Sequence, residues 1–156
     1  MQMQVELIKN YINKLFKPLF LVTLLLCLFS CKRVKTTPTV NETYADGKPK
    51  RVTEYIVDEH GAQQLYKETY YFPEEKKYVE GNYDKEERRD GIWTSWYENG
   101  NKNSEVRYIN GKEDGKYRVW HPNGKLYIKG KYEMGCKVGT WEIYDSLGVK
   151  TKEMKF

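Results

Sequence analysis

The chain has 156 residues, which is enough for one domain and hardly for two. Charged residues make up 31% of it and aromatic residues 15%, and so many aromatics exclude a disordered chain. Without residues 1–30, which hold three Lys and one Glu, the net charge falls from +5 to +3. This small, mixed charge gives no support for nucleic-acid binding.

Residues 1–30 predict a secretory signal peptide. Lys9, Lys14 and Lys17 precede the uncharged run Leu19–Phe29. That run is too short to span a bilayer, which needs about 20 residues. A basic segment before a short apolar run is typical of a signal peptide. The alternatives are a buried helix or a membrane anchor.

The sequence Leu28-Phe29-Ser30-Cys31 resembles a bacterial lipobox. The resemblance implies cleavage before Cys31 and attachment of lipid to its thiol. Two or more acyl chains anchor a protein stably, whereas one chain binds only marginally. The alternative is a soluble secreted protein that is cut nearby.

Residues 31–50 predict a polar, flexible tether with Pro38, Gly47 and Pro49. About 20 flexible residues have a reach of about 25 Å, which would hold a domain away from the membrane. Lys32 and Arg33 would alternatively contact anionic headgroups.

An internal repeat of 24 residues dominates the rest of the chain. Five sets recur in register: Gly91, Gly115 and Gly139; Trp93, Tyr117 and Trp141; Trp96, Trp120 and Tyr144; Gly100, Gly124 and Gly148; and Tyr108, Tyr132 and Phe156. An earlier half-copy, residues 71–83, aligns without gaps to residues 120–132, and residues 57–68 resemble a degenerate copy. The sequence therefore predicts a repeat protein.

Each repeat predicts a β-hairpin. In the first, the strand Gly91–Tyr97 leads to an Asn-Gly turn and the return strand Ser104–Tyr108. Alternation of side chains places Trp93 and its equivalents on an inner face and Trp96 and its equivalents on the opposite face. One hairpin cannot stand alone, because ordering its backbone costs about 1–2 kcal/mol per residue. Copies must stack to bury their aromatics.

The pattern Gly-x-Trp, then Trp or Tyr, Asn-Gly and a closing Tyr resembles the MORN repeat, and its 24-residue form is closest to the bacterial MORN-variant family. The resemblance covers about residues 71–156, with a start at Thr53 as the alternative. It implies an all-β fold, an elongated antiparallel sheet of successive hairpins, which we expect over residues 51–156. Some family members are described as antitoxins. The family has no common reaction, so no catalytic residue carries over.

The two histidines predict turns rather than a site. His121 takes the repeat position of Tyr97 and Asp145, directly before Pro122-Asn123-Gly124, and His60 precedes Gly61. With Cys136 alone after Cys31, the sequence predicts no disulfide, metal site, cofactor or enzymatic activity.

The outward aromatics Trp96, Trp120 and Tyr144 are the candidate partner-binding residues. Packing against neighbouring side chains is the alternative for them. We expect a lipoprotein anchored through Cys31, on the periplasmic side of the outer membrane, that binds a protein or acts as a scaffold. The alternatives are an immunity or antitoxin-type protein and a structural lipoprotein contacting cell wall or lipid.

The last strand predicts either an exposed edge or a dimer contact. The repeats run in phase to Phe156, and Lys150, Lys152 and Lys155 would guard an edge left open there.

Overall fold

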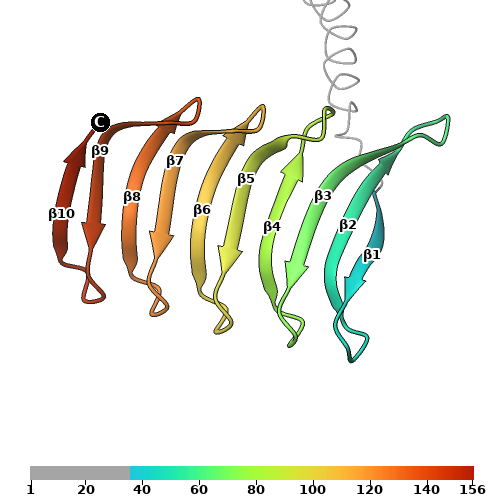
Figure 1. The fold of residues 1–156 in the computed structure, drawn as a ribbon, viewed down its shortest axis with the longest axis horizontal. Coiled ribbons are helices and arrows are strands. Elements are labelled where there is room, and N and C mark those ends of the chain that lie inside the picture. The colour runs from blue at the N-terminus through green and yellow to red at the C-terminus, as the bar shows by residue number, and fades with distance from the viewer. Residues whose placement is uncertain (1–35) are drawn as a thin grey trace, which may run out of the picture. The chain divides into compact units, whose positions relative to one another are not determined.

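The computed structural model describes residues 36–156, which form one antiparallel sheet with its ten strands in chain order (Figure 1). The strands are β1 (Thr36–Thr43), β2 (Pro49–Val57), β3 (Gln63–Tyr71), β4 (Lys77–Tyr83), β5 (Arg89–Trp96), β6 (Lys102–Ile109), β7 (Lys112–Trp120), β8 (Leu126–Glu133), β9 (Cys136–Tyr144) and β10 (Lys150–Lys155). The predicted all-β sheet of successive hairpins is confirmed. The signal peptide and Cys31 lie outside the described residues.

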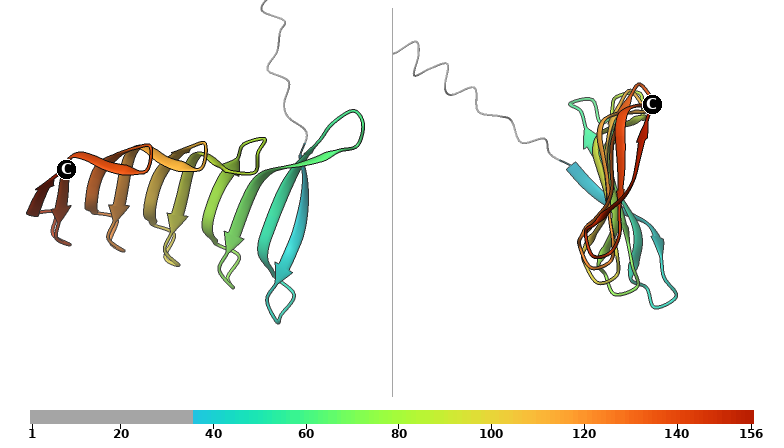
Figure 2. Two further views of the ribbon diagram at one scale, coloured as in Figure 1. Left: turned by 45° about the horizontal axis from the view of Figure 1, so that its top comes forward. Right: turned by 90° about the vertical axis from the view of Figure 1, so that its left-hand side faces the viewer.

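The sheet is a single twisted layer, and over residues 36–156 no second layer packs on either face (Figure 2). Within this range there is also no helix of the length and apolarity needed to cross a membrane. Every side chain therefore has to find its packing partners on its own face of the sheet or in the turns.

Five-residue turns close the hairpins within the repeats. In Tyr97–Asn101, the Tyr97 amide donates to the Asn101 carbonyl, and the Gly100 amide donates to the Tyr97 carbonyl. Gly100 has φ of 86°, a left-handed conformation that glycine adopts without steric cost. The turns beginning at His121 and Asp145 repeat this pattern. The turn assignment of the Asn-Gly signals is thus confirmed.

Two-residue turns link these repeats, although glycines recur four residues apart at Gly111 and Gly115 and at Gly135 and Gly139. They consist of Asn110-Gly111 and Met134-Gly135, all at positive φ as a type I′ turn requires. Gly115 and Gly139 instead lie within β7 and β9, at register shifts of the sheet. Both roles need a positive φ, so the sequence alone could not separate a turn glycine from a bulge glycine.

The predicted tether is wrong over residues 36–50, because β1 and the start of β2 occupy them. β1 pairs along its length with β2, and the Tyr44 and Gly47 amides make the same turn bonds as those of Tyr97 and Gly100. The sheet therefore begins at Thr36 and not at residue 51.

The inner face holds the only two large apolar side chains of residues 36–156 that are buried, Trp93 and Trp141. Each indole lies over a glycine of the preceding strand, Gly81 in β4 and Gly130 in β8, where a methyl group would overlap the ring. Tyr83 and Tyr132 meet the indoles edge-on, with ring centroids 5.3 and 5.0 Å apart.

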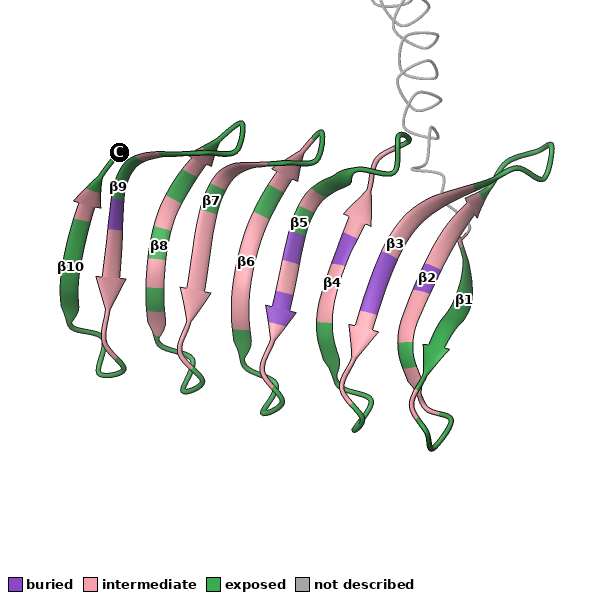
Figure 3. Cartoon of the chain, viewed as in Figure 1, coloured by how far each residue is buried: buried purple, intermediate pink, exposed green. Residues whose placement is uncertain are grey.

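Most other strand residues are only half-buried (Figure 3). The sheet is thus stabilised by a thin row of rings and glycines on one face and not by a closed core. This makes each ring–glycine contact a large part of the local stability.

We predict that Gly130→Ala lowers the free energy of unfolding by about 2 kcal/mol, because the added methyl group overpacks the Trp141 ring. Thr140→Ala, at an exposed position next to Trp141, is the matched control and should change it by less than about 0.5 kcal/mol. Chemical denaturation measures both. Equal effects of the two substitutions would contradict the packing role of Gly130.

Candidate functional site

The outward face carries a row of three rings, Trp96 of β5, Trp120 of β7 and Tyr144 of β9, which we call the ring row. Each ring lies beside a lysine ammonium of the preceding strand. The Nζ atoms of Lys77, Lys102 and Lys129 lie 6.0, 5.7 and 5.6 Å from the respective ring centroids. Such cation–π contacts are worth about 0.5–1 kcal/mol at exposed sites. The three predicted residues are thus brought together as one repeated arrangement.

Nearby carboxylates fix the first two of these lysines. Lys77 pairs with Glu80 at 2.6 Å, and Lys102 pairs with Glu105 at 2.7 Å, in both cases through a Lys-x-x-Glu spacing along the strand. In the next hairpin this spacing holds Leu126 and Lys129 instead. There Lys129 itself lies beside the ring of Tyr144 and pairs with Glu142 across the strands.

The charge partners of Glu80 shift its acidity. Burial disfavours the ionised carboxylate, but hydrogen bonds from Lys67 and Lys77 outweigh it and lower the pKa of Glu80. Lys67 lies 2.9 Å from Glu80 and also faces Glu54 at 3.8 Å. At neutral pH Glu80 is therefore an ionised partner of both lysines.

The rings of the row are half-buried, so they are neither fully covered nor free. The Tyr144 hydroxyl donates to a Glu142 carboxylate oxygen at 3.0 Å. Within residues 36–156 no side chain or carbonyl accepts from the indole N–H of Trp96 or Trp120, and neither nitrogen is a buried unpaired atom. Both indoles thus keep a hydrogen-bond donor open to solvent or to a ligand.

The turns beside the row connect successive repeats. The Tyr97 hydroxyl donates to the Trp120 carbonyl at 2.8 Å, and His121 Nε2 lies 2.9 Å from the Tyr144 carbonyl. Because a carbonyl only accepts, Nε2 of His121 must carry the proton. His121 is therefore a structural turn residue, as the sequence predicts.

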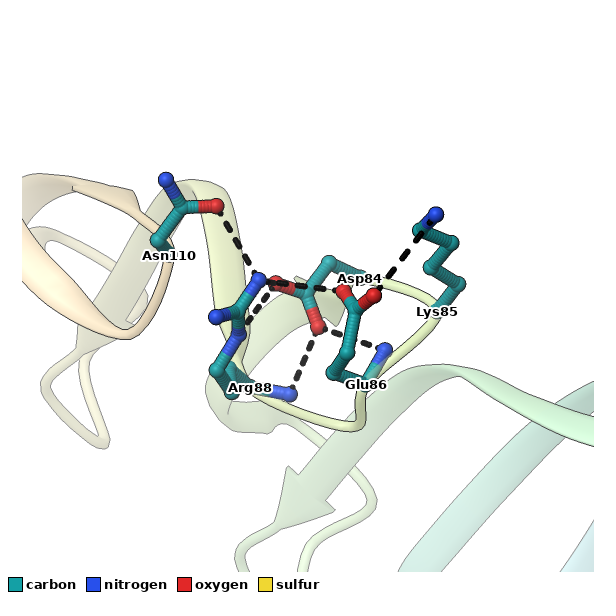
Figure 4. A network of polar contacts seen from close by, with 5 residues as sticks. All are labelled: Asp84, Lys85, Glu86, Arg88 and Asn110. Atoms are coloured by element: carbon teal, nitrogen blue, oxygen red, sulfur yellow. Dashed lines mark hydrogen bonds and ion pairs between the residues drawn. The ribbon is translucent and has the colours of Figure 1, made fainter.

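The turns at the other ends of the strands are connected in the same way. Figure 4 shows Arg88 bonded to Asp84 of its own turn and to the Asn110 side chain of the next turn, at 2.8 and 3.1 Å. The Gly111 amide donates to the Arg89 carbonyl at 3.0 Å, and the Gly135 amide donates to the Glu113 carbonyl at 2.8 Å. Bonds between turns at both ends of the strands therefore fix the distance between neighbouring rings of the row.

No cluster of three or more His, Cys, Asp or Glu in the described part of the chain could hold a metal ion. Cys136 is a free, exposed thiol at the start of β9, and His60 lies exposed in the turn after β2. The structure leaves these residues apart from the ring row.

We predict that Tyr97→Phe lowers the free energy of unfolding by about 1 kcal/mol, because it removes the bond from one turn to the next. Tyr127→Phe is the control, since Tyr127 is 38% exposed and its hydroxyl makes no bond to another residue of the sheet. Thermal unfolding compares the two. If both substitutions are neutral, the bonds between turns do not stabilise the sheet.

Comparison with known proteins bears directly on the repeats. Residues 89–110 and 113–134 each match the MORN repeat variant family. The comparisons with curated proteins and with solved structures gave no significant match. The matched segments correspond to the hairpins β5–β6 and β7–β8, which present Trp96 and Trp120. Two adjacent segments of the chain are thus similar to MORN repeat variant units.

Proposed function

We propose that this chain binds a protein partner through the ring row of Trp96, Trp120 and Tyr144. The observation that carries the proposal is a half-buried ring at the same place in three successive repeats, each beside a lysine of the preceding strand. No second layer covers this face over residues 36–156. An uncovered face with regularly spaced rings is suited to recognition.

The dimensions of the row fit a protein ligand. Neighbouring strands lie about 4.8 Å apart, and the rings occupy every second strand, so the row extends about 19 Å. Trp and Tyr are among the residue types that dominate binding energy at protein interfaces. An extended segment or one helix of a partner would cover the row.

We also propose that the protein is an envelope lipoprotein, anchored through Cys31 and facing the periplasm. The support is the basic segment, the short apolar run and the lipobox-like sequence before Cys31. Since the sheet begins at Thr36, five residue steps separate it from Cys31, a span of at most about 18 Å. The domain would then work close to the membrane surface.

We predict that Trp96→Ala combined with Trp120→Ala abolishes partner capture. The native tagged protein is crosslinked in its own cells, and co-purifying proteins are identified by mass spectrometry. The double variant should lose its dominant partner because both rings and both open donors are removed. The control, Tyr78→Ala with Tyr127→Ala, removes two exposed aromatics outside the row and should retain it.

The outcomes separate the alternatives. Capture that is unchanged in the folded double variant would refute the role of the ring row. A secreted toxin as the captured partner would identify the protein as an immunity protein. Retention on isolated cell-wall sacculi without a protein partner would identify a structural lipoprotein.

We predict that Cys31→Ser moves the protein from the membrane fraction to the soluble fraction. Without the thiol, the acyl chains that make anchoring stable cannot be attached. Cell fractionation and intact-mass measurement test this, with Cys136→Ser as the control because that thiol lies in the sheet. If the wild-type mass shows no lipid, the anchor proposal fails.

A further inference from the structure

Two pairs of like charges lie directly opposite each other on β7 and β8. Lys116 pairs in register with Lys131, and Arg118 pairs with Lys129. Directly opposite residues of antiparallel strands share a face, and like charges at these positions are destabilising. The fold thus places four cations side by side at a cost in stability.

Carboxylates pair with three of these four cations and leave Lys116 without one. Arg118 lies 3.5 Å from Glu105, and Lys129 pairs with Glu142. Lys131 pairs with Glu133 of its own strand, and both of these side chains are exposed. Lys116 has no carboxylate within ion-pairing distance among residues 36–156, and the same is true of Arg107 on β6.

The cations surround a shallow groove on the outward face. It has a volume of about 540 Å³ and is lined by Ile92, Glu105, Arg107, Gly115, Lys116, Arg118 and Lys131. We call it the basic groove. Gly115 contributes no side chain, which leaves room between the cations, and Ile92 is 58% exposed at the margin.

The neighbouring repeats show that the fold does not require these cations. The positions equivalent to Lys116 hold Ile92 in the preceding repeat and Thr140 in the following one. The positions equivalent to Arg118 hold Thr94 and Glu142. A local arrangement that costs stability and is absent from equivalent repeats is expected at functional sites.

We propose that the basic groove binds an extended acidic segment of a protein partner, with carboxylates at alternate positions. Lys116 and Arg118 are two residues apart on one strand, about 6.8 Å, which is also the spacing of alternate side chains in an extended ligand. The cations come from three strands, β6, β7 and β8, so they suit several carboxylates along an extended segment better than one compact anion. Ile92 adds an apolar contact.

This inference rests on the proposed function and names the chemistry of the partner. The basic groove and the ring row lie on the same face and share β5 and β7, which carry Ile92, Trp96, Lys116 and Trp120. One partner can therefore contact both, with the charges adding rate and specificity to the binding by the rings.

The test uses the full chain purified in detergent and a fluorescein-labelled peptide of alternating Glu and Thr. Fluorescence anisotropy should show binding that weakens as salt is raised, because the charges are exposed. Lys116→Gln with Lys131→Gln should weaken binding about tenfold or more. The control with equal loss of charge, Lys85→Gln with Lys152→Gln, lies outside the groove and should change it by less than about twofold.

Lys116→Glu provides a second readout. It replaces the like-charge pair with an opposite-charge pair facing Lys131, so the midpoint of thermal unfolding should rise while peptide binding is lost. A variant that merely unfolds would lower both the midpoint of thermal unfolding and the peptide binding. A lower midpoint with a folded protein would contradict the cost assigned to the Lys116–Lys131 pair.

Three results would overturn the inference. The first is equal binding of a matched peptide of alternating Gln and Thr. The second is binding of inorganic phosphate, or of phosphatidylglycerol vesicles, that depends on Lys116 and Lys131 while the acidic peptide does not bind. The third is an equal loss in the control variant. Partner capture that still depends on Trp96 and Trp120 would then leave the proposed function standing alone.

Discussion

A sheet without a second layer has to bury apolar surface within its own face, and this protein does so by laying an indole over glycine. Trp93 lies on Gly81, and Trp141 lies on Gly130, one strand back in each case. In the middle repeat the residue opposite Tyr117 is Val106, and there the ring stays half-buried. The two buried rings are thus the two that lie over a glycine of the preceding strand.

Because of this constraint, the inner face provides the packing and the outward face is free to vary. The inner face has to carry an aromatic ring in each repeat, as Trp93, Tyr117 and Trp141 show. The outward face only has to remain soluble, and its positions are free to differ, as Ile92, Lys116 and Thr140 show. The bonds between turns at both ends of the strands keep the strands in register. A different outward residue in one repeat therefore changes the surface and leaves the backbone of the sheet unchanged.

The 24-residue period was sufficient to predict the hairpins, the two faces and the shared place of Trp96, Trp120 and Tyr144. It missed the first hairpin, because Pro38 and Pro49 made residues 31–50 look like a linker. A signal was present: Tyr44-Ala45-Asp46-Gly47 has the Tyr-to-Gly spacing of the turn that begins at Tyr97, and the Tyr44 hydroxyl bonds to the Tyr71 carbonyl as Tyr97 bonds to Trp120. The opposed cations could not be predicted, because they depend on the strand register.

The strands run across the long direction of the sheet in chain order, and this has a mechanical consequence (Figure 1). A force that pulls β1 and β10 apart acts along the hydrogen bonds between strands, so these bonds break one after another. A force parallel to the strands would instead load all the hydrogen bonds of a strand pair at the same time. Each 24-residue unit that peels away releases roughly 80 Å of chain. The domain would therefore yield in small steps under load and extend without losing its remaining hairpins.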